Sequence, residues 1–379
     1  MTTYLSPEQL YDALALRDLT DPASRTEDEP PHAMEQLLNS AVTALAEGWR
    51  IDSRIVRVSP LVSVQDNYDR LGFDRTAVTR DARYSRYVSP TVMLRSHTSA
   101  AVPDLLKSIA AQRNCDHHDR LYALPGLVYR RDAIDRTHVG APHQVDLWRV
   151  TDGPAQTDTD LMVMVETLVE SVLPGARWRT VPSPHPYTRN GRQVDVRHGG
   201  EWLELAECGL IDPALLERSG LDSARWSGLA LGMGLERALM LRKGIPDIRL
   251  LRATDQRIAD QMLGLEPWRP VSMQPPIRRD LSLVVGWETD EETLGDRVRT
   301  ALGPRASWLE SVQLLSTATY DDLPHHARRR LQIEPGQVNA LVRLTLRPLD
   351  RTLTDDAANE IRDEVYRAVH EGHVLELIG

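Results

Sequence analysis

The residues best suited to chemistry lie in one short segment, Tyr129–Arg149, which reads YRRDAIDRTHVGAPHQVDLWR. Its arginines, aspartates and histidines would suit a metal site, an anion site or a solvated charged hairpin. His138 and His143 have no His-Glu-x-x-His helix and no cysteine pair beside them, which disfavours metal ligation by these histidines. We therefore expect both histidines to be accessory to an anion site, and no protein metal centre.

Arginines in two separated segments favour the anion site. In a strand through LVYRRD, alternation sends Arg130 and Arg131 to opposite faces, so one guanidinium can enter a cleft and bind a phosphate. Far downstream, Gly228–Leu241 reads GLALGMGLERALML, a glycine-rich strand that runs into an apolar helix with Arg237 in its first turn. Glycines allow a nucleotide to approach the backbone, and a helix N-terminus attracts anions. The pair suits a nucleoside triphosphate.

The elements around these segments predict an α+β fold. Strand-like runs predominate from Val92 to Gly244, and helical runs interrupt them at Asp160–Val172 and Gly234–Lys243. Because strands and helices do not alternate regularly, the pattern favours an antiparallel sheet. Ahead of this region we expect a helix at Pro7–Leu16, an amphipathic helix at His32–Glu47 and a strand in RIVRVSPLVSV.

The C-terminal part has a different pattern. A proline-rich stretch, Gly264–Asp280, looks like a linker, and the elements after it follow the order βαββαβ of a ferredoxin-like domain. They include a helix at Glu291–Leu302, a second helix with Thr354 as N-cap, and a last strand in HVLELIG. The predicted organisation is an N-terminal extension (1–30), a catalytic domain (31–264), a linker (265–279) and a ferredoxin-like domain (280–379).

Composition limits the function classes. No run of 18 apolar residues and no basic-then-apolar leader is seen, so we expect neither a membrane partner nor secretion. Two cysteines in 379 residues fit a reducing compartment, and we expect a cytoplasmic protein. The net charge of −10 argues against a general DNA-binding protein, although a local basic patch can meet a structured RNA.

These motifs resemble those of one family, the phenylalanyl-tRNA synthetases among the class II aminoacyl-tRNA synthetases. YRRDAIDRTH with HQVD is similar to motif 2, and GLALGMGLER is similar to motif 3. Further similar strings are QDNYDRLG, TRDARYSRYV, MLRSHTSA, WLELAECGLIDP and GIPDIRLL, and IRRDLSLVV with LRPLDRTLTDDAANEI resembles the anticodon-binding domain. A catalytic core and an anticodon-binding domain on one chain are typical of the organellar type.

The resemblance implies an ATP- and Mg²⁺-dependent activation of an amino acid, followed by transfer to tRNA held through the C-terminal domain. Arg130 and Arg237 would contact the α- and γ-phosphates and stabilise developing charge. The amino acid would lie among His97, Ser99, Gln144, Asp146, His185, Tyr187, Glu207, Ala230 and Gly232. The nucleotide and its magnesium would be assisted by Asp132, His138 and Glu236.

Several positions depart from the family pattern. Pro142 replaces the phenylalanine that stacks on adenine, and Asp146 replaces a glutamate. His185 and Tyr187 stand where the family has two phenylalanines, and Glu207 stands where it has glycine. The implied pocket is more polar, so phenylalanine or a more polar aromatic amino acid is the expected substrate. Two further readings stay open: an adenylate-forming paralogue with a non-tRNA acceptor, and a weakly catalytic nucleotide- or tRNA-binding regulator.

Overall fold

The computed structural model describes residues 4–81, 84–112, 117–130, 135–271, 275–349 and 351–374. Its contacts divide the chain into two compact units. Unit 1 is Met1–Arg130, Ala141–Ile245 and Asp260–Trp268, and unit 2 is Arg131–Gly140, Pro246–Ala259 and Arg269–Gly379, each within the described ranges.

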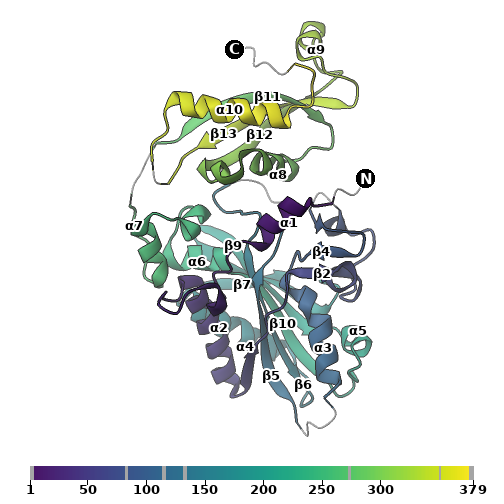
Figure 1. Cartoon of the computed structure of the whole chain (residues 1–379). Coiled ribbons are helices and arrows are strands. Elements are labelled where there is room, and N and C mark those ends of the chain that lie inside the picture. Colours follow the sequence, from purple (N-terminus) through teal and green to yellow (C-terminus); the bar gives the residue numbers. More distant parts are fainter. Residues whose placement is uncertain are drawn as a thin grey trace. The chain divides into compact units, whose positions relative to one another are not determined.

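Unit 1 is built on a seven-stranded sheet with the order β1-β5-β6-β10-β9-β8-β7 (Figure 1). Only the pairing of β1 with β5 is parallel among these neighbours, which confirms the predicted antiparallel sheet. The strands are β1 (Asp52–Ile55), β5 (Asp119–Leu127), β6 (His143–Thr151), β7 (Trp178–Pro182), β8 (Thr188–His198), β9 (Glu201–Ile211) and β10 (Ser227–Gly234). A small sheet joins β2 (Leu61–Ser63), β4 (Val92–Leu94) and β3 (Arg86–Tyr87).

Helices cover both faces of the large sheet, with α2 and α4 on one side and α3 and α5 on the other (Figure 1). The helices of unit 1 are α1 (Pro7–Leu14), α2 (Ala33–Trp49), α3 (Val102–Ala110), α4 (Asp158–Val172), α5 (Pro213–Arg218) and α6 (Leu235–Lys243). α3 and α5 pack through Leu106, Leu215 and their neighbours onto Trp148 and Ala230 of the sheet. The predicted helices at Asp160–Val172 and Gly234–Lys243 are therefore confirmed within two residues at each end.

Two predicted strands differ from the structure. The stretch RIVRVSPLVSV is divided between β1 and β2, because Ser59 and Pro60 break the run. The strand expected through LVYRRD ends earlier, since β5 stops at Leu127 and Arg130 makes only an isolated bridge with Ser85. The prediction that Arg130 and Arg131 point to opposite faces assumed a continuous strand, and β5 ends before Arg130. Residues 131–134, which include Arg131, lie outside the described part of the chain.

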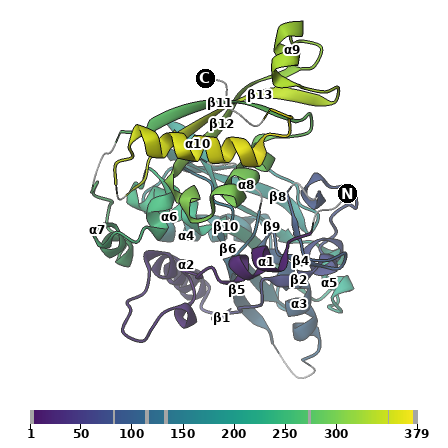
Figure 2. The same ribbon diagram turned by 45° about the horizontal axis from the view of Figure 1, so that its top comes forward.

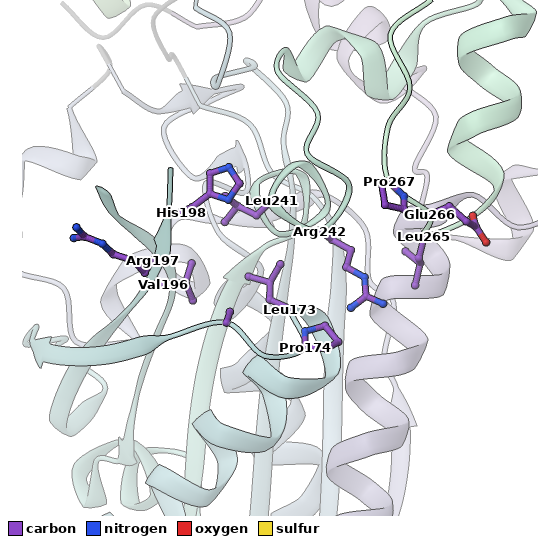
Figure 3. Close-up of a pocket in the computed structure, with 11 residues that line it drawn as sticks. Leu173, Pro174, Val196, Arg197, His198, Leu241, Arg242, Leu265, Glu266 and Pro267 are labelled. Carbon is purple, nitrogen blue, oxygen red and sulfur yellow. The ribbon is translucent and has the colours of Figure 1, made fainter. Parts of the chain in front are cut away.

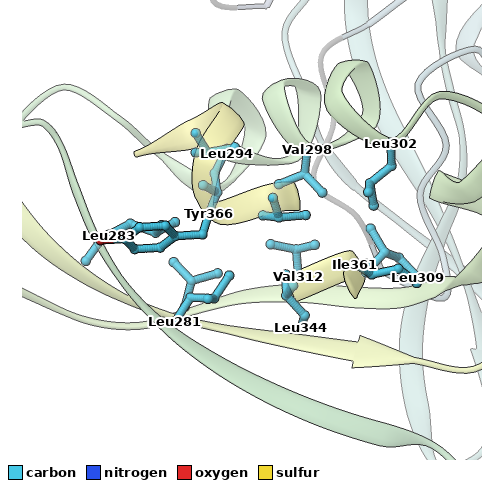
Figure 4. Packing of buried hydrophobic residues seen from close by; sticks show 14 of the residues in the cluster. Leu281, Leu283, Leu294, Val298, Leu302, Leu309, Val312, Leu344, Ile361 and Tyr366 are labelled. Atoms are coloured by element: carbon cyan, nitrogen blue, oxygen red, sulfur yellow. The ribbon is translucent and has the colours of Figure 1, made fainter. Parts of the chain in front are cut away.

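Unit 2 has a three-stranded antiparallel sheet, β11-β13-β12, with α8 and α10 packed on one face (Figure 4). Its elements are α7 (Gln256–Ala259), β11 (Ile277–Gly286), α8 (Glu291–Leu302), β12 (Leu309–Thr319), α9 (His325–Leu331), β13 (Gln337–Leu346) and α10 (Asp355–Val369). The short helix α9 stands apart on the connection from β12 to β13 (Figure 2). Thr354 caps α10 as predicted, its hydroxyl accepting from Ala357 N.

Apart from the short helix α9 between β12 and β13, which was not predicted, the described elements from β11 to α10 follow the predicted order βαββα. Beyond α10, the chain runs beside β11, where Glu371 N donates to Val284 O at 2.8 Å. That is the edge at which the expected last strand would pair, but residues 375–379 lie outside the described ranges. The final strand therefore stays a prediction.

Candidate functional site

The centre of the site is a strip of small residues on β10, which we call the glycine strip: Ala230, Gly232 and Gly234. In the antiparallel register, Gly232 lies between Asp146 on β6 and Glu207 on β9. Directly opposed residues point to the same face of a sheet. A Cβ atom added to Gly232 would stand 3.6 Å from Gln144 Nε2 and 3.9 Å from Asp146 Oδ1. The strip is thus open backbone flanked by a carboxylate on each side.

Asp146 is a buried acceptor with only 2% of its surface exposed. Its carboxylate accepts from Thr98 Oγ1 at 2.5 Å, Ser99 Oγ at 2.9 Å and Trp148 Nε1 at 3.1 Å. Burial raises the pKa of Asp146, and these hydrogen bonds oppose the rise. A desolvated carboxylate next to open backbone is suited to bind a substrate ammonium group.

Gln144 and Ser99 are held in the same place. The Gln144 side-chain oxygen accepts from Thr98 N at 3.2 Å, which leaves its amide nitrogen turned toward Gly232. Ser99 lies in the short 3₁₀ turn Thr98–Ala101 and is buried. The structure therefore brings Ser99, Gln144, Asp146 and Gly232 together, as the resemblance implied.

Aromatic rings line the neighbouring space. Phe73 stacks on His97 with centroids 5.5 Å apart, and Tyr187 lies 6.1 Å from both Phe73 and Trp148. Burial, and then the charge of Asp146, raise the pKa of Tyr187. Phe73 and Trp148 were not among the predicted site residues, although Phe73 is the chain's single phenylalanine and follows the motif QDNYDRLG.

His97 is a buried ring beside this aromatic enclosure. Both of its ring nitrogens are buried and find no hydrogen-bond partner among the described residues. Burial, followed by the charge of Arg130, lowers the pKa of His97 to about 3, while a weaker interaction with the Asn67 backbone opposes this. Unpartnered buried nitrogens cost folding free energy unless a ligand satisfies them.

The depressed pKa of His97 predicts a pH-dependent loss of stability. The unfolded ring takes up a proton below its ordinary pKa near 6.5, whereas the folded ring stays neutral down to about 3. The free energy of unfolding therefore falls as the pH drops below about 6.5. The loss reaches about 2 kcal/mol at pH 5. Urea unfolding at pH 7.5 and 5 should show this loss in the wild type and a smaller one in His97→Gln. The exposed-ring control His198→Gln should behave like the wild type, and equal losses in all three proteins would contradict the assignment.

His185 and Glu207 form a polar pair on the other side of the glycine strip. His185 Nε2 lies 2.9 Å from Glu207 Oε2, and Ser183 Oγ donates to Glu207 Oε1 at 3.1 Å. The hydrogen bond from His185 lowers the pKa of Glu207 against the effect of burial. Both predicted residues are thus brought to the site, where they bind each other.

The two predicted arginines lie around a third acidic group, Glu204. Arg237 Nη1 donates to Glu204 O at 3.3 Å, and Arg130 Nε donates to Ser96 O at 2.8 Å. Burial, and then the charge of Glu207, raise the pKa of Glu204, while the charges of Arg237 and Arg130 lower it. Sequence reasoning missed Glu204, although it lies in the quoted string WLELAECG.

A β-bulge explains why the side chains of Glu204 and Glu207 lie on the same face of β9. Strict alternation would send residues three apart to opposite faces of β9. The register against β8 shifts between Val194, opposite Ala206, and Asp195, opposite Glu204. The extra residue at Leu205 restores both carboxylates to the same face. No local sequence pattern marks this bulge.

The first turn of α6 lies at the end of the glycine strip, and we call it, with Arg237, the phosphate end of the site. Gly234 is its N-cap and makes no side-chain capping bond, so the first backbone N–H groups receive no side-chain cap. Such a helix start favours an anion. The guanidinium of Arg237 stands in the same first turn.

Other predicted residues are placed differently. Glu236 is buried, and both of its oxygens accept from His143 N, at 2.9 and 2.7 Å. His138 belongs to unit 2, where its Nδ1 lies 2.7 Å from Asp135 Oδ2. Burial alone would raise the pKa of Asp135, but hydrogen bonds from His138 and Thr137 lower it to about 2. Asp132 lies outside the described residues.

The open face at Gly232 predicts a separation of folding from activity. In Gly232→Ala the new Cβ meets its neighbours at ordinary contact distance, so the free energy of unfolding should change by less than about 1 kcal/mol. The methyl group stands between Gln144 and Asp146, and kcat/KM for the amino acid should fall on the order of tenfold. On the same strand, Gly228→Ala would bring Cβ to 2.1 Å from Arg149 O and should lose stability instead. Thermal unfolding and steady-state kinetics of both variants test this contrast; an unchanged kcat/KM in Gly232→Ala would contradict it.

A separate hollow of about 620 Å³ lies at the opposite end of α6 (Figure 3). Leu173, Val196, Leu241 and Leu265 form much of its wall, and it shares no residue with the predicted site. Among the described residues, no group of three or more His, Cys, Asp or Glu side chains is arranged to hold a metal ion by itself. The described helices also include none that is both long and apolar enough to cross a membrane.

Comparison with known proteins places this geometry in a family. The chloroplastic/mitochondrial phenylalanine–tRNA ligase of Arabidopsis thaliana is 28% identical over 335 residues, covering 84% of this chain and 72% of that protein. The mitochondrial phenylalanine–tRNA ligase of Saccharomyces cerevisiae is 24% identical over 435 residues, covering 93% of this chain and 88% of that protein. The phenylalanine–tRNA ligase alpha subunit of Prochlorococcus marinus strain MIT 9313 is 36% identical over 195 residues, 52% of this chain and 56% of the subunit, so the chain spans about half its length.

The family model described as tRNA synthetases class II core domain (F) matches residues 18–262. This range contains the glycine strip, the buried Asp146 and both arginines. The chain belongs to the class II tRNA synthetases with this core domain.

Proposed function

We propose that this protein activates an aromatic amino acid with ATP and transfers it to tRNA-Phe, as a single-chain phenylalanine–tRNA ligase. The observation that carries the proposal is the placement, around the glycine strip, of a buried carboxylate at Asp146, an aromatic enclosure that includes His97, and two arginines, Arg237 and Arg130, whose charges both act on Glu204. The names of the relatives support the same activity.

The residues define the roles in the first step. Asp146, Ser99 and Gln144 hold the ammonium group, so that the amino acid's carboxylate faces the ATP. A carboxylate oxygen bonds to the α-phosphorus while the bond to the β-phosphate oxygen breaks, and pyrophosphate leaves. Arg130 and Arg237 bind the phosphates and stabilise the charge that develops on their oxygens. The chain contributes positioning and electrostatics and no covalent intermediate.

The residues present fit a magnesium ion bound together with ATP. Magnesium is usually held by one or two carboxylates plus substrate phosphates. We assign Glu204 to this role because it lies on the same face of β9 as Glu207, and two neighbouring carboxylates favour a cation. The ion supplies neutralisation of phosphate charge. Glu236, which the resemblance implied for the same role, accepts from His143 N through both of its oxygens.

The remaining partners follow the same proposal. Unit 2, whose sheet β11-β13-β12 carries α8 and α10, is the proposed tRNA-binding part, and the domain boundaries at 31–264 and 280–379 are retained as part of the proposal. No DNA or membrane partner is proposed. The cytoplasmic location stays a prediction, and the organelles named for the plant and yeast ligases belong to those relatives.

The His185–Glu207 pair bears on the choice of substrate. It places a hydrogen-bonded acid and imidazole beside the aromatic enclosure, which favours an aromatic amino acid with a polar substituent over a purely apolar one. The comparisons do not favour the two other readings, a non-tRNA acceptor and a weakly catalytic regulator.

ATP–pyrophosphate exchange with a panel of phenylalanine, tyrosine and hydroxy- or amino-substituted phenylalanines tests the proposal. Exchange with at least one of them, followed by its transfer to tRNA-Phe, is the expected result. Exchange without transfer would indicate a non-tRNA acceptor. The absence of exchange with every member of the panel would refute the activation step.

A further inference from the structure

The N-terminal segment Asp18–Asp21, which we call the strap, lies against the core of unit 1. Thr20 is fully buried, and its N and Oγ1 donate to Asp18 Oδ1 at 2.8 and 2.6 Å. Arg57 donates to the Thr20 carbonyl and, at 3.1 Å, to Thr20 Oγ1. The strap is therefore a folded and anchored part of the unit.

The strap makes a direct bond to the strand of motif 2. Leu19 N donates to His143 Nε2 at 2.9 Å, and His143 has no exposed surface. A ring nitrogen that accepts a hydrogen bond carries no proton, so the proton of the neutral ring is on Nδ1. That nitrogen lies 2.6 Å from Glu236 Oε1 and donates to it. Asp18 Oδ1 lies 3.5 Å from the same Nε2 atom.

Glu236 connects this chain of bonds to the phosphate end. It stands in the first turn of α6, next to Arg237, and accepts from His143 through both the backbone and the ring. Fixing a buried side chain in the first turn fixes the rotation of the helix about its axis. The direction of Arg237 toward Glu204 depends on that rotation.

A second set of contacts connects the strap, through Asp18 and Arg95, to the backbone before Arg130. Asp18 and Arg95 lie together over Gly126, whose added Cβ would come within 3.2 Å of Asp18 Oδ2 and 2.1 Å of Arg95 Nη2. Arg95 Nε donates to Leu127 O at 2.8 Å, and Arg95 O accepts from Tyr129 N at 2.9 Å. These bonds hold the backbone that leads into Arg130.

We infer that the strap is a positioning element of the nucleotide site: Leu19 fixes the His143 tautomer that holds Glu236 beside Arg237, and Asp18 supports the Arg95 bonds beside Arg130. The inference rests on the proposed nucleotide site and adds to it a segment outside the synthetase motifs. The strap acts through His143, Glu236 and Arg95, and so sets the geometry of the two arginines proposed to bind the phosphates.

Leu19→Pro tests the inference, because proline lacks the N–H that bonds to His143. The matched control is Leu19→Ala, which loses the side chain and keeps the N–H. Relative to this control, Leu19→Pro should raise KM for ATP on the order of tenfold and leave KM for the amino acid within about twofold. Nitrogen-15 spectra of histidine-labelled full-length protein should show His143 protonated on Nδ1 in the control and a mixture of tautomers in Leu19→Pro.

A folded Leu19→Pro variant with the control's KM for ATP and the control's His143 spectrum would overturn the inference. If Leu19→Pro does not fold, Asp18→Asn replaces it, with the exposed Asp28→Ala as control; an unchanged KM for ATP in Asp18→Asn would overturn it equally. The affinity for ATP can also be measured by calorimetry in each variant. Neither calorimetry nor the nitrogen-15 spectra require the amino acid. A wild type without exchange would therefore refute the proposed reaction and leave these two measurements to decide the role of the strap.

Discussion

Arg237→Ala should lower ATP–pyrophosphate exchange on the order of 10²–10³-fold, the range found when one charge-stabilising donor is removed from an active site. Arg237 stands in the first turn of α6 and donates to Glu204 O, so its guanidinium is fixed at the phosphate end while the chain fold does not depend on it. Exchange rates with saturating amino acid, together with a thermal unfolding curve, measure both properties.

Two matched variants separate the possible causes. Arg242→Ala removes an arginine from the other end of the same helix and should keep the wild-type exchange rate. Arg237→Lys keeps the charge but loses the forked geometry, and should recover only part of the activity. Wild-type exchange in Arg237→Ala would show that motif 3 has been assigned to the wrong role.

Asp146→Asn should cost about 2–5 kcal/mol of transition-state binding of the amino acid, the range for breaking a buried charge pair. The change retains one oxygen, which can accept from Ser99 and Trp148, and places an amide NH2 group opposite Thr98, whose hydroxyl can accept from it; the charge that balances the ammonium group is removed. The loss should appear in kcat/KM for the amino acid, whereas KM for ATP should change little. Steady-state exchange kinetics with each substrate varied in turn measure this difference.

The same variant should not be less stable than the wild type near neutral pH. Because burial raises the pKa of Asp146, its ionised form costs folding free energy at neutral pH, and this cost falls as the pH drops and the carboxyl group takes up a proton. Asparagine removes the charge and therefore the cost. Asp146→Ala is the contrasting variant, since it leaves Thr98, Ser99 and Trp148 without their acceptor and should destabilise the fold by about 1–3 kcal/mol. An Asp146→Asn protein that is active but unstable would contradict the assignment.

The sequence predicted the elements of the site well where the pattern is local. The helix after the glycine strip begins at Leu235, one residue after the expected Gly234, and the last helix is capped by Thr354 as expected, because capping and periodicity depend on neighbouring residues. The strand expected through Arg130 was wrong beyond Leu127, since pairing with a neighbour and not alternation ends a strand. Glu204 was missed because its side is set by the bulge at Leu205.

The sequence alone determined which charged groups occur and in which order. It also determined the small residues that leave the backbone of β10 uncovered by side chains. It could not determine which partner each group takes, because partners are fixed by packing between distant segments. Glu236 and His143 are 93 residues apart, and His143 and Leu19 are 124 apart. Only the folded sheet brings them into contact and excludes water from the bonds between them. The tertiary structure therefore decided that Glu236 supports the site from within, and that Asp146 and Glu207 face one another across Gly232.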